Sequence, residues 1–217
     1  MIDNLHNIDS IIFDMDGTLW DATESYARIW NETCQSFGLE STFRSSDLLP
    51  LMGMSIESIM HRLLRNLLPV DKFTFLKMLA HKEAMLMPQL GGVLFPGVSE
   101  GLEALHGHYR LFMLSNCSAT GLVNFVNYTA TSHLFEGLLT QGERRASKSE
   151  NLRYLAQLYS LKAPVYVGDT QADCDQAHEA DMPFFFATWG FGSCNGADMT
   201  FDSFNDLVNS FLKLHCH

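Results

Sequence analysis

Basic residues are scarce in this sequence and long apolar runs are missing. Both absences exclude classes of binding partner. Only 14 Lys and Arg stand against 25 Asp and Glu, for a formal net charge of -11. Nucleic-acid binding needs clustered positive charge, so we expect no nucleic-acid partner. No apolar run approaches the roughly 18 residues of a membrane span, and residues 1–9 lack the basic and apolar regions of a signal peptide. We therefore expect a cytoplasmic protein with no membrane partner.

Paired cysteines are also lacking. The five cysteines are odd in number, lie far apart, and include no Cys-x-x-Cys pair. This pattern favours free thiols in a reducing compartment over a disulfide framework. The final tripeptide His215-Cys216-His217 contains metal-binding residue types. An untethered terminus is a poor metal site, so we interpret it as incidental.

The arrangement of apolar segments predicts an α/β fold. The chain has 217 residues, of which 47% are apolar, so it can bury a large core. Short apolar runs alternate with segments of helical periodicity, which is typical of a Rossmann-like parallel sheet with helices on both faces. The expected strands are 11–13, 109–114, 137–140, 164–167, 183–187 and 199–201. The expected helices are 21–37, 55–68, 71–87, 98–106, 119–131, 147–159, 170–181 and 204–214.

Residues 21–91 contain no strand signal. Three helices are expected there, separated by a turn at residues 48–54 that contains Pro50 and Gly53. Asp21 and Glu24 have the spacing of a helix N-cap pair. We therefore predict two units: an α/β core formed by residues 1–20 and 92–217, and an all-helical cap formed by residues 21–91. No feature of the sequence specifies an oligomeric state.

The first expected strand ends in a cluster of carboxylates. Residues 10–21 read Ser-Ile-Ile-Phe-Asp-Met-Asp-Gly-Thr-Leu-Trp-Asp, so Asp14 and Asp16 follow the apolar run directly. Ligands bind beyond the carboxyl ends of parallel strands, and Gly17 allows the chain to turn sharply there. Two adjacent carboxylates indicate either acid/base chemistry or a divalent cation. An Asp-Gly turn without any function is the competing interpretation.

Two further segments supply groups that suit a phosphate. Ser115 and Asn116 follow the second apolar strand of the core, where a hydroxyl and backbone N–H groups at a helix start can bind an anion. A simple serine N-cap is the alternative. Lys148 lies in the first turn of an expected helix, where its charge opposes the helix dipole. A bound phosphate or a neighbouring carboxylate would compensate that charge. Arg144 and Arg145 are alternatives for the same role.

A third strand end carries Gly168, Asp169 and, four residues after Asp169, Asp173. Asp169 falls at the same sheet edge as Asp14 and Asp16, where uncompensated carboxylates would repel one another. A hard cation with oxygen ligands removes that conflict, and Mg²⁺ is the common choice beside phosphate. Asp173 has a second interpretation, because Thr170 and Asp173 also have the spacing of a capping box.

Taken together, these motifs resemble the four motifs of the haloacid dehalogenase superfamily, in order and in spacing. The residues that carry the resemblance are Asp14-Met15-Asp16-Gly17-Thr18, Ser115, Lys148, and Gly168-Asp169 with Asp173. A helical insert between the first and second motifs resembles the C1 cap of the phosphoglycolate phosphatase and β-phosphoglucomutase branch. Segment 188–192, Thr-Trp-Gly-Phe-Gly, also looks like a feature of phosphoglycolate phosphatases, and a simple glycine-rich turn is the alternative.

The resemblance implies a Mg²⁺-dependent, phosphoglycolate phosphatase-like enzyme that hydrolyses a small phosphomonoester through an aspartyl-phosphate, with a small phosphorylated metabolite as its partner. Asp14 would attack phosphorus and Asp16 would act as acid and then base. The implied phosphate-binding residues are Thr18, Ser115, Asn116 and Lys148. The implied metal-binding residues are Asp14, Asp16 (through its backbone carbonyl), Asp169 and Asp173, the last directly or through water. Dehalogenases lack a carboxylate at the position of Asp16, which argues against a dehalogenase.

Substrate contacts are expected from the cap. The candidates are Trp20 and the turn formed by Met52, Gly53, Met54 and Ser55, although core packing is the favoured role for each. Residues 51–57 contain no basic group, unlike the corresponding loop of β-phosphoglucomutases. A phosphomutase is therefore the alternative enzyme, and a non-catalytic protein that binds a phosphorylated metabolite is the alternative outside enzymes.

Overall fold

A six-stranded parallel sheet forms the centre of the molecule. The computed structural model describes residues 7–40, 42–64, 71–144 and 146–214. The strand order is β5-β4-β1-β6-β7-β8, and every neighbouring pair is parallel. The first strand lies between β4 and β6, so three of the predicted strand ends meet at one edge. The strands are β1 (Ser10–Phe13), β4 (Arg110–Ser115), β5 (Gly137–Thr140), β6 (Pro164–Gly168), β7 (Phe184–Ala187) and β8 (Met199–Phe201).

Alternating side chains of the strands fill two separate cores. Ile11 and Phe13 of β1 belong to the larger cluster, whereas Ile12, between them, belongs to the smaller cluster on the opposite face. Successive strand residues point to opposite faces, so a strand buried on both sides is apolar throughout. All four residues of β1 are buried. The predicted α/β class with a parallel sheet is confirmed.

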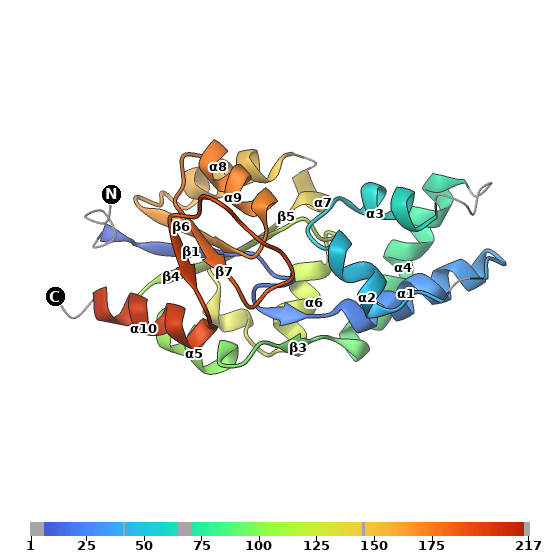
Figure 1. The fold of residues 1–217 in the computed structure, drawn as a ribbon, viewed down its shortest axis with the longest axis horizontal. Coiled ribbons are helices and arrows are strands. Elements are labelled where there is room, and N and C mark those ends of the chain that lie inside the picture. Colours follow the sequence, from blue (N-terminus) through green and yellow to red (C-terminus); the bar gives the residue numbers. More distant parts are fainter. Residues whose placement is uncertain (1–6, 41, 65–70, 145, 215–217) are drawn as a thin grey trace.

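Helices cover both faces of the sheet (Figure 1). In this view α8 and α9 lie above the sheet, while α5 and α10 lie below it. The helices that follow the helical insert are α5 (Val98–His106), α6 (Gly121–Tyr128), α7 (Gln141–Arg144), α8 (Lys148–Leu158), α9 (Gln171–Glu179) and α10 (Phe204–Leu214), with a 3-10 turn at Ser132–Leu134. The predicted ranges of α5 and α10 agree with the structure, and α7 was not predicted because a single turn has no periodicity.

Four helices between β2 and β3 lie together at one end of the molecule, away from both termini (Figure 1). They are α1 (Thr23–Ser36), α2 (Ser45–Leu48), α3 (Ile56–Leu63) and α4 (Lys72–Leu90), and a 3-10 turn spans Leu49–Leu51. Helix α4 packs on α1 and on α6. Trp30 of α1 and Phe75 of α4 stack with ring centroids 5.8 Å apart. This helical block joins the sheet through apolar contacts, since its side chains share the larger core.

Two very short strands connect the helical block to the sheet. β2 (Trp20–Asp21) and β3 (Val93–Leu94) pair antiparallel, with Trp20 opposite Leu94. A two-residue strand has too little alternation to be predicted from sequence. The pair lies at the predicted limits of the helical block. The division into a core (1–20 and 92–217) and a cap (21–91) stays a prediction.

Several details near the helix ends differ from expectation. Ala22, not Asp21, stands at the N-cap of α1, and the Asp21 carboxylate accepts the backbone N–H and the hydroxyl of Thr23. Helix α2 was not predicted, because it has only four residues. Helix α3 ends at Leu63, with Leu64 as its C-cap, one residue into the expected continuation, and residues 65–68 of the expected helix lie outside the described residues. Among the residues that the structure describes, no helix has both the length and the apolar character for crossing a membrane.

Candidate active site

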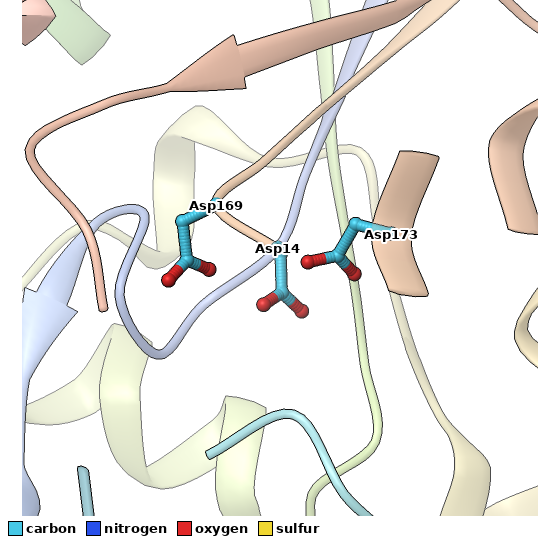
Figure 2. Close-up of side chains that lie close together, drawn as sticks. All are labelled: Asp14, Asp169 and Asp173. Atoms are coloured by element: carbon cyan, nitrogen blue, oxygen red, sulfur yellow. The ribbon is translucent and has the colours of Figure 1, made fainter. Parts of the chain in front are cut away.

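Three carboxyl groups meet at the carboxyl ends of β1 and β6 (Figure 2). Asp14 follows β1, Asp169 follows β6, and Asp173 lies in the first turn of α9. Figure 2 shows Asp14 between the other two. One oxygen of each lies within 4.8 Å of an oxygen of the others, and the three residues are at most 3% exposed. Buried carboxylates so close together require a positive charge or shared protons.

Lys148 supplies part of that positive charge. Its Nζ lies 3.2 Å from Asp14 Oδ1 and 2.5 Å from Asp173 Oδ1, and the residue is 4% exposed. Burial alone would disfavour the ammonium form, but the charges of Asp14 and Asp173 raise the pKa of Lys148. Ser147 and Glu150 form the predicted capping box at the start of α8. The cap fixes the helix start and thereby the position of Lys148.

Asp173 combines the two roles that its sequence position allowed. Its Oδ2 accepts the backbone N–H and the hydroxyl of Thr170, at 3.1 and 2.6 Å, which forms the capping box of α9. Its Oδ1 faces Lys148 and accepts a hydrogen bond from the Tyr166 hydroxyl at 3.4 Å. The carboxylate is therefore held from both sides, which suits a supporting role in an ion site.

Burial shifts the protonation of the central carboxyls. The pKa of Asp14 rises from 3.8 to about 6, because burial outweighs the favourable charge of Lys148. The pKa of Asp169 also rises, through burial and the charges of Asp173 and Asp14. Phe191 opposes this rise, since its backbone N–H donates to Asp169 Oδ2 at 2.8 Å. The three-carboxyl cluster therefore carries more negative charge than Lys148 offsets.

Asp16 is partly buried beside this cluster and has its own two hydrogen-bond donors. Trp20 Nε1 donates to Oδ1 at 2.9 Å, and the Tyr26 hydroxyl donates to Oδ2 at 3.3 Å. Burial and the neighbouring charge of Asp14 raise the pKa of Asp16 to about 8. A carboxyl that keeps its proton near neutral pH suits general acid catalysis.

The predicted phosphate-binding residues lie around Asp14 in different settings. Thr18 is fully buried and its Oγ1 donates to Asp169 Oδ1 at 3.5 Å. Ser115, at the end of β4, is 4% exposed. Asn116 follows it and turns its side chain toward the helical block, where its Nδ2 donates to the Gly53 carbonyl at 3.0 Å. This bond places the expected turn over the strand ends.

The predicted substrate-contact residues also separate into two groups. Met52, Gly53, Met54 and Ser55 are all partly exposed, and Ser55 caps α3 by accepting the Ser58 N–H. Trp20 is fully buried, and its indole packs edge-on against Phe125 with ring centroids 5.0 Å apart. The structure therefore shows Trp20 as a packing residue that also positions Asp16.

The loop after β7 completes the enclosure of Asp169. A Cβ added to Gly190 would lie 2.3 Å from Asp169 Cβ and 2.4 Å from the Gly17 carbonyl, so only glycine fits there. Trp189 Nε1 donates to the Thr18 carbonyl at 3.0 Å. Segment 188–192, seen in the sequence as a glycine-rich turn or family feature, thus shapes the site directly.

Two residues near Asp16 were not predicted from the sequence. Tyr26 is one of several apolar positions with helical spacing on α1, so its hydroxyl role had no separate signal. Glu83 lies inside α4 and is only 9% exposed, and its Oε1 accepts the Ser118 hydroxyl at 2.7 Å. A charged residue at a buried position of an amphipathic helix was the available signal for Glu83.

Of the two alternative cations, Arg144 does not occupy the place of Lys148. Arg144 Nε donates to Asn151 Oδ1, and its guanidinium stacks on Tyr154 at 3.5 Å from the ring centroid. Arg145 and the tail 215–217 lie outside the described residues.

The donor set of this site fits Mg²⁺. The ligand atoms on offer are carboxylate oxygens, which a hard divalent cation prefers. Burial raises the pKa of Asp14 and of Asp169, and the charges of neighbouring carboxylates add to the rise, so a bound cation would favour their ionised forms. Glycines at positions 17 and 190 leave room for the Asp169 carboxylate to face the cluster. A bound divalent cation would stabilise the ionised form of all three carboxylates.

Comparisons with known proteins agree on one family. Residues 11–187 match the family model described as haloacid dehalogenase-like hydrolase. The phosphoglycolate phosphatase of Aquifex aeolicus is 26% identical over 207 residues, covering 91% of this chain and 94% of that protein. The phosphoglycolate phosphatase of Synechococcus elongatus is 29% identical over 185 residues, covering 84% of each chain. A haloacid dehalogenase-like hydrolase from Streptococcus pneumoniae shares the fold, with a TM-score of 0.80, 22% identity, and coverage of 94% of this chain and 98% of the other.

Proposed function

Because the chain belongs to the haloacid dehalogenase-like hydrolase family, we propose that it hydrolyses a small phosphomonoester with Mg²⁺ through an aspartyl-phosphate on Asp14. The observation that carries this proposal is the buried Asp14 carboxylate, held 3.2 Å from Lys148 and grouped with Asp169 and Asp173. The phosphoglycolate phosphatases among its relatives support a phosphatase.

The first step transfers the phosphoryl group to Asp14. A carboxylate oxygen of Asp14 forms a bond to phosphorus while the ester P–O bond breaks. Asp16, whose pKa is raised to about 8, gives its proton to the leaving oxygen. Trp20 and Tyr26 then stabilise the resulting carboxylate through their N–H and O–H donors.

The second step releases phosphate. Ionised Asp16 takes a proton from a water molecule as the water oxygen attacks the phosphorus of the aspartyl-phosphate. The bond between phosphorus and Asp14 breaks, which regenerates both carboxyl groups in their starting states. The same residue therefore acts as acid and then as base.

Neighbouring side chains would stabilise the transferring group. Lys148, Thr18 and Ser115 would hold the phosphoryl oxygens, and backbone N–H groups at Asn116 would assist. Asp14, Asp169 and the Asp16 carbonyl would hold Mg²⁺, with Asp173 in direct or water-mediated support. When bound, the ion offsets the negative charge that the carboxylates and the phosphate bring together.

The helical block would act as a cap over this site. Support comes from the hydrogen bond between Asn116, after β4, and Gly53, in the turn before α3. Closure would exclude water from the phosphoryl group and present the turn at residues 52–55 to the substrate. The paired strands β2 and β3 are the natural hinge, since the chain passes between the two units there.

Phosphate release tests this proposal. We expect the protein to release inorganic phosphate from small phosphomonoesters only with Mg²⁺, and the Asp14→Asn variant to lose at least about 10³-fold in kcat because the nucleophile is gone. Asp206→Asn is the matched control and should keep its activity, since Asp206 lies on the exposed surface of α10, outside the site. Metal-independent release, or full activity in Asp14→Asn, would refute the proposal. Interconversion of a sugar phosphate with an added bisphosphate and no net phosphate release would instead indicate a mutase.

A further inference from the structure

Glu83 brings an unexpected carboxyl group from the helical block to the site. It lies in α4, far in sequence from the strand-end motifs, yet its side chain is 9% exposed and bonded to Ser118 in the loop after β4. Its charge contributes to raising the pKa of Asp16, Tyr26 and Cys117. Glu83 therefore faces the side of the site where Asp16 stands.

No cation pairs with Glu83 within the described part of the chain. Of the ion pairs found there, none includes Glu83. Burial raises its pKa, and only the Ser118 hydroxyl opposes that rise. A buried carboxyl with one neutral partner is costly, so residues of this kind are normally paired.

A buried acceptor in the loop that carries Ser118 has no hydrogen-bond partner in the described structure. The Oδ1 atom of Asn116 is buried without a hydrogen bond, while its Nδ2 is occupied by the Gly53 carbonyl. Asn116 and Ser118 belong to the same loop. The acceptors at this loop, Asn116 Oδ1 and the Glu83 carboxylate of α4, outnumber the one donor that serves them, the Ser118 hydroxyl. Buried acceptors without partners are rare in proteins and point to a group that binds there.

In the proposed reaction, the leaving group of the substrate is expected to lie beside these acceptors. In the proposed reaction Asp16 gives its proton to the leaving oxygen, so the leaving group lies next to Asp16. Glu83 reaches this side of the site from the helical block, since its carboxylate accepts the hydroxyl of Ser118, three residues after Ser115 at the end of β4. It thus adjoins the part of the substrate beyond the ester oxygen.

We propose that Glu83 determines specificity by accepting a hydrogen bond from the leaving group, and selects phosphomonoesters that carry a hydroxyl or ammonium group there. This inference rests on the proposed phosphatase function. It also implies discrimination against leaving groups that carry a carboxylate, because the ionised carboxylate of Glu83 would repel a second carboxylate buried beside it. Lys148 is paired with Asp14 and Asp173, and in the proposed reaction it binds the transferring phosphoryl group rather than the leaving group.

Four phosphomonoesters of similar size test this assignment: ethyl phosphate, 2-hydroxyethyl phosphate, 2-aminoethyl phosphate and 2-phosphoglycolate. The four esters differ only in the group on the carbon that does not carry the phosphate. The ratio of kcat/KM for each ester to kcat/KM for ethyl phosphate therefore measures how well the enzyme recognises that group. For the unaltered protein with Mg²⁺, we expect the hydroxyl or the ammonium ester to exceed 2-phosphoglycolate by at least about 10-fold. The relative rates of those two esters identify the preferred donor.

Glu83→Gln keeps the shape of the side chain and the acceptor for Ser118 but removes the charge. We expect the ratio for 2-phosphoglycolate to rise and the ratio for the preferred donor ester to fall, each by roughly 10-fold. Glu57→Gln is the matched control on the exposed surface of α3 and should change neither ratio by more than about twofold. The ranking of the four esters by the unaltered protein tests the proposal even if Glu83→Gln does not fold.

The failures of the two proposals are distinguishable. A preference of the unaltered protein for 2-phosphoglycolate, or unchanged ratios in folded Glu83→Gln, would overturn the role of Glu83 and leave the phosphatase intact. No Mg²⁺-dependent release from any of the four esters or from para-nitrophenyl phosphate would overturn the phosphatase proposal and this inference with it.

Discussion

At the scale of single residues, the environment of Asp16 explains how one carboxyl serves as both acid and base. Burial and Asp14 keep its pKa high, while Trp20 and Tyr26 donate to its two oxygens. Raised pKa favours the acid form, and the two donors limit the energetic cost of the ionised form. The balance of these opposing effects sets the pH range in which Asp16 can exchange its proton with substrate and water.

Removal of the Tyr26 hydroxyl should shift that balance. Tyr26→Phe removes a donor that stabilises ionised Asp16, so the pKa of Asp16 rises. We expect the alkaline limb of the kcat/KM profile to move to higher pH by roughly half a unit, because one unit corresponds to about 1.4 kcal/mol and a 3.3 Å hydrogen bond contributes less. Tyr154→Phe is the control on α8. A profile that is unchanged or moves to lower pH would contradict the assigned role.

Gly190 offers a second test at this scale. In Gly190→Ala the new methyl group would overlap Asp169 and the Gly17 carbonyl, so one of them must move. We expect weaker Mg²⁺ activation and a loss of about 10²-fold in kcat/KM, since small displacements of catalytic groups are costly. Gly107→Ala is the control, because its added Cβ would lie 3.5 Å from the Ala104 carbonyl oxygen, an ordinary contact. Equal Mg²⁺ activation in both variants would count against a metal role for Asp169.

The sequence predicted the residues at strand ends better than the residues that support them. Asp14 and Asp169 follow apolar runs, and the parallel order of strands brings such positions together. Tyr26 and Glu83 reach the site from helices, where the approach depends on how the helical block packs against the sheet. That packing is set by many distributed apolar contacts, which a single sequence does not order in space.

At the scale of elements, the start of α8 links helix stability to the site. The Ser147 side chain accepts the Glu150 N–H, and Lys148 is the next residue along. The same motif was visible in the sequence, because a capping box depends only on local spacing. Elements without local signals were missed instead: β2, β3 and α2 are each four residues or shorter.

Loss of this cap should lower both stability and activity. Ser147→Ala removes the acceptor for the Glu150 N–H, which costs about 1 kcal/mol. We expect the melting temperature to fall by roughly 3 °C, together with a measurable decrease in kcat as Lys148 loses its fixed position. Ser36→Ala, at the exposed end of α1, should change neither quantity. A Ser147→Ala variant as stable as the unaltered protein would show that the cap is dispensable.

At the scale of the whole molecule, the acidic cluster opposes folding when no metal is bound. The pKa values of Asp14 and Asp16 rise on folding from 3.8 to about 6 and about 8. The folded chain therefore binds more protons than the unfolded chain between about pH 4 and 8, so the free energy of unfolding falls as pH rises through this window. Mg²⁺ should reverse the effect by favouring the ionised carboxylates.

Thermal unfolding measures this directly. We expect the metal-free protein to melt at a lower temperature at pH 8 than at pH 5.5, and saturating Mg²⁺ to raise the melting temperature at pH 8 by roughly 5 °C or more. The increase at pH 5.5 should be smaller, since protons compete with the ion. Ca²⁺-free buffer and the Asp169→Asn variant provide the controls. A Mg²⁺ effect that is equal at both pH values, or unchanged in Asp169→Asn, would contradict the placement of the ion.

The central claim is that Asp14 carries the phosphoryl group, and the phosphorylated chain itself is the most direct test. In Asp16→Ala the base for hydrolysis is missing, while para-nitrophenyl phosphate has a leaving group that needs no proton. Acid quenching after one nitrophenolate is released per chain, followed by peptide mass mapping, should show a single phosphoryl group on Asp14. Nitrophenolate release with an unmodified chain, or with the phosphoryl group on another residue, would contradict the mechanism.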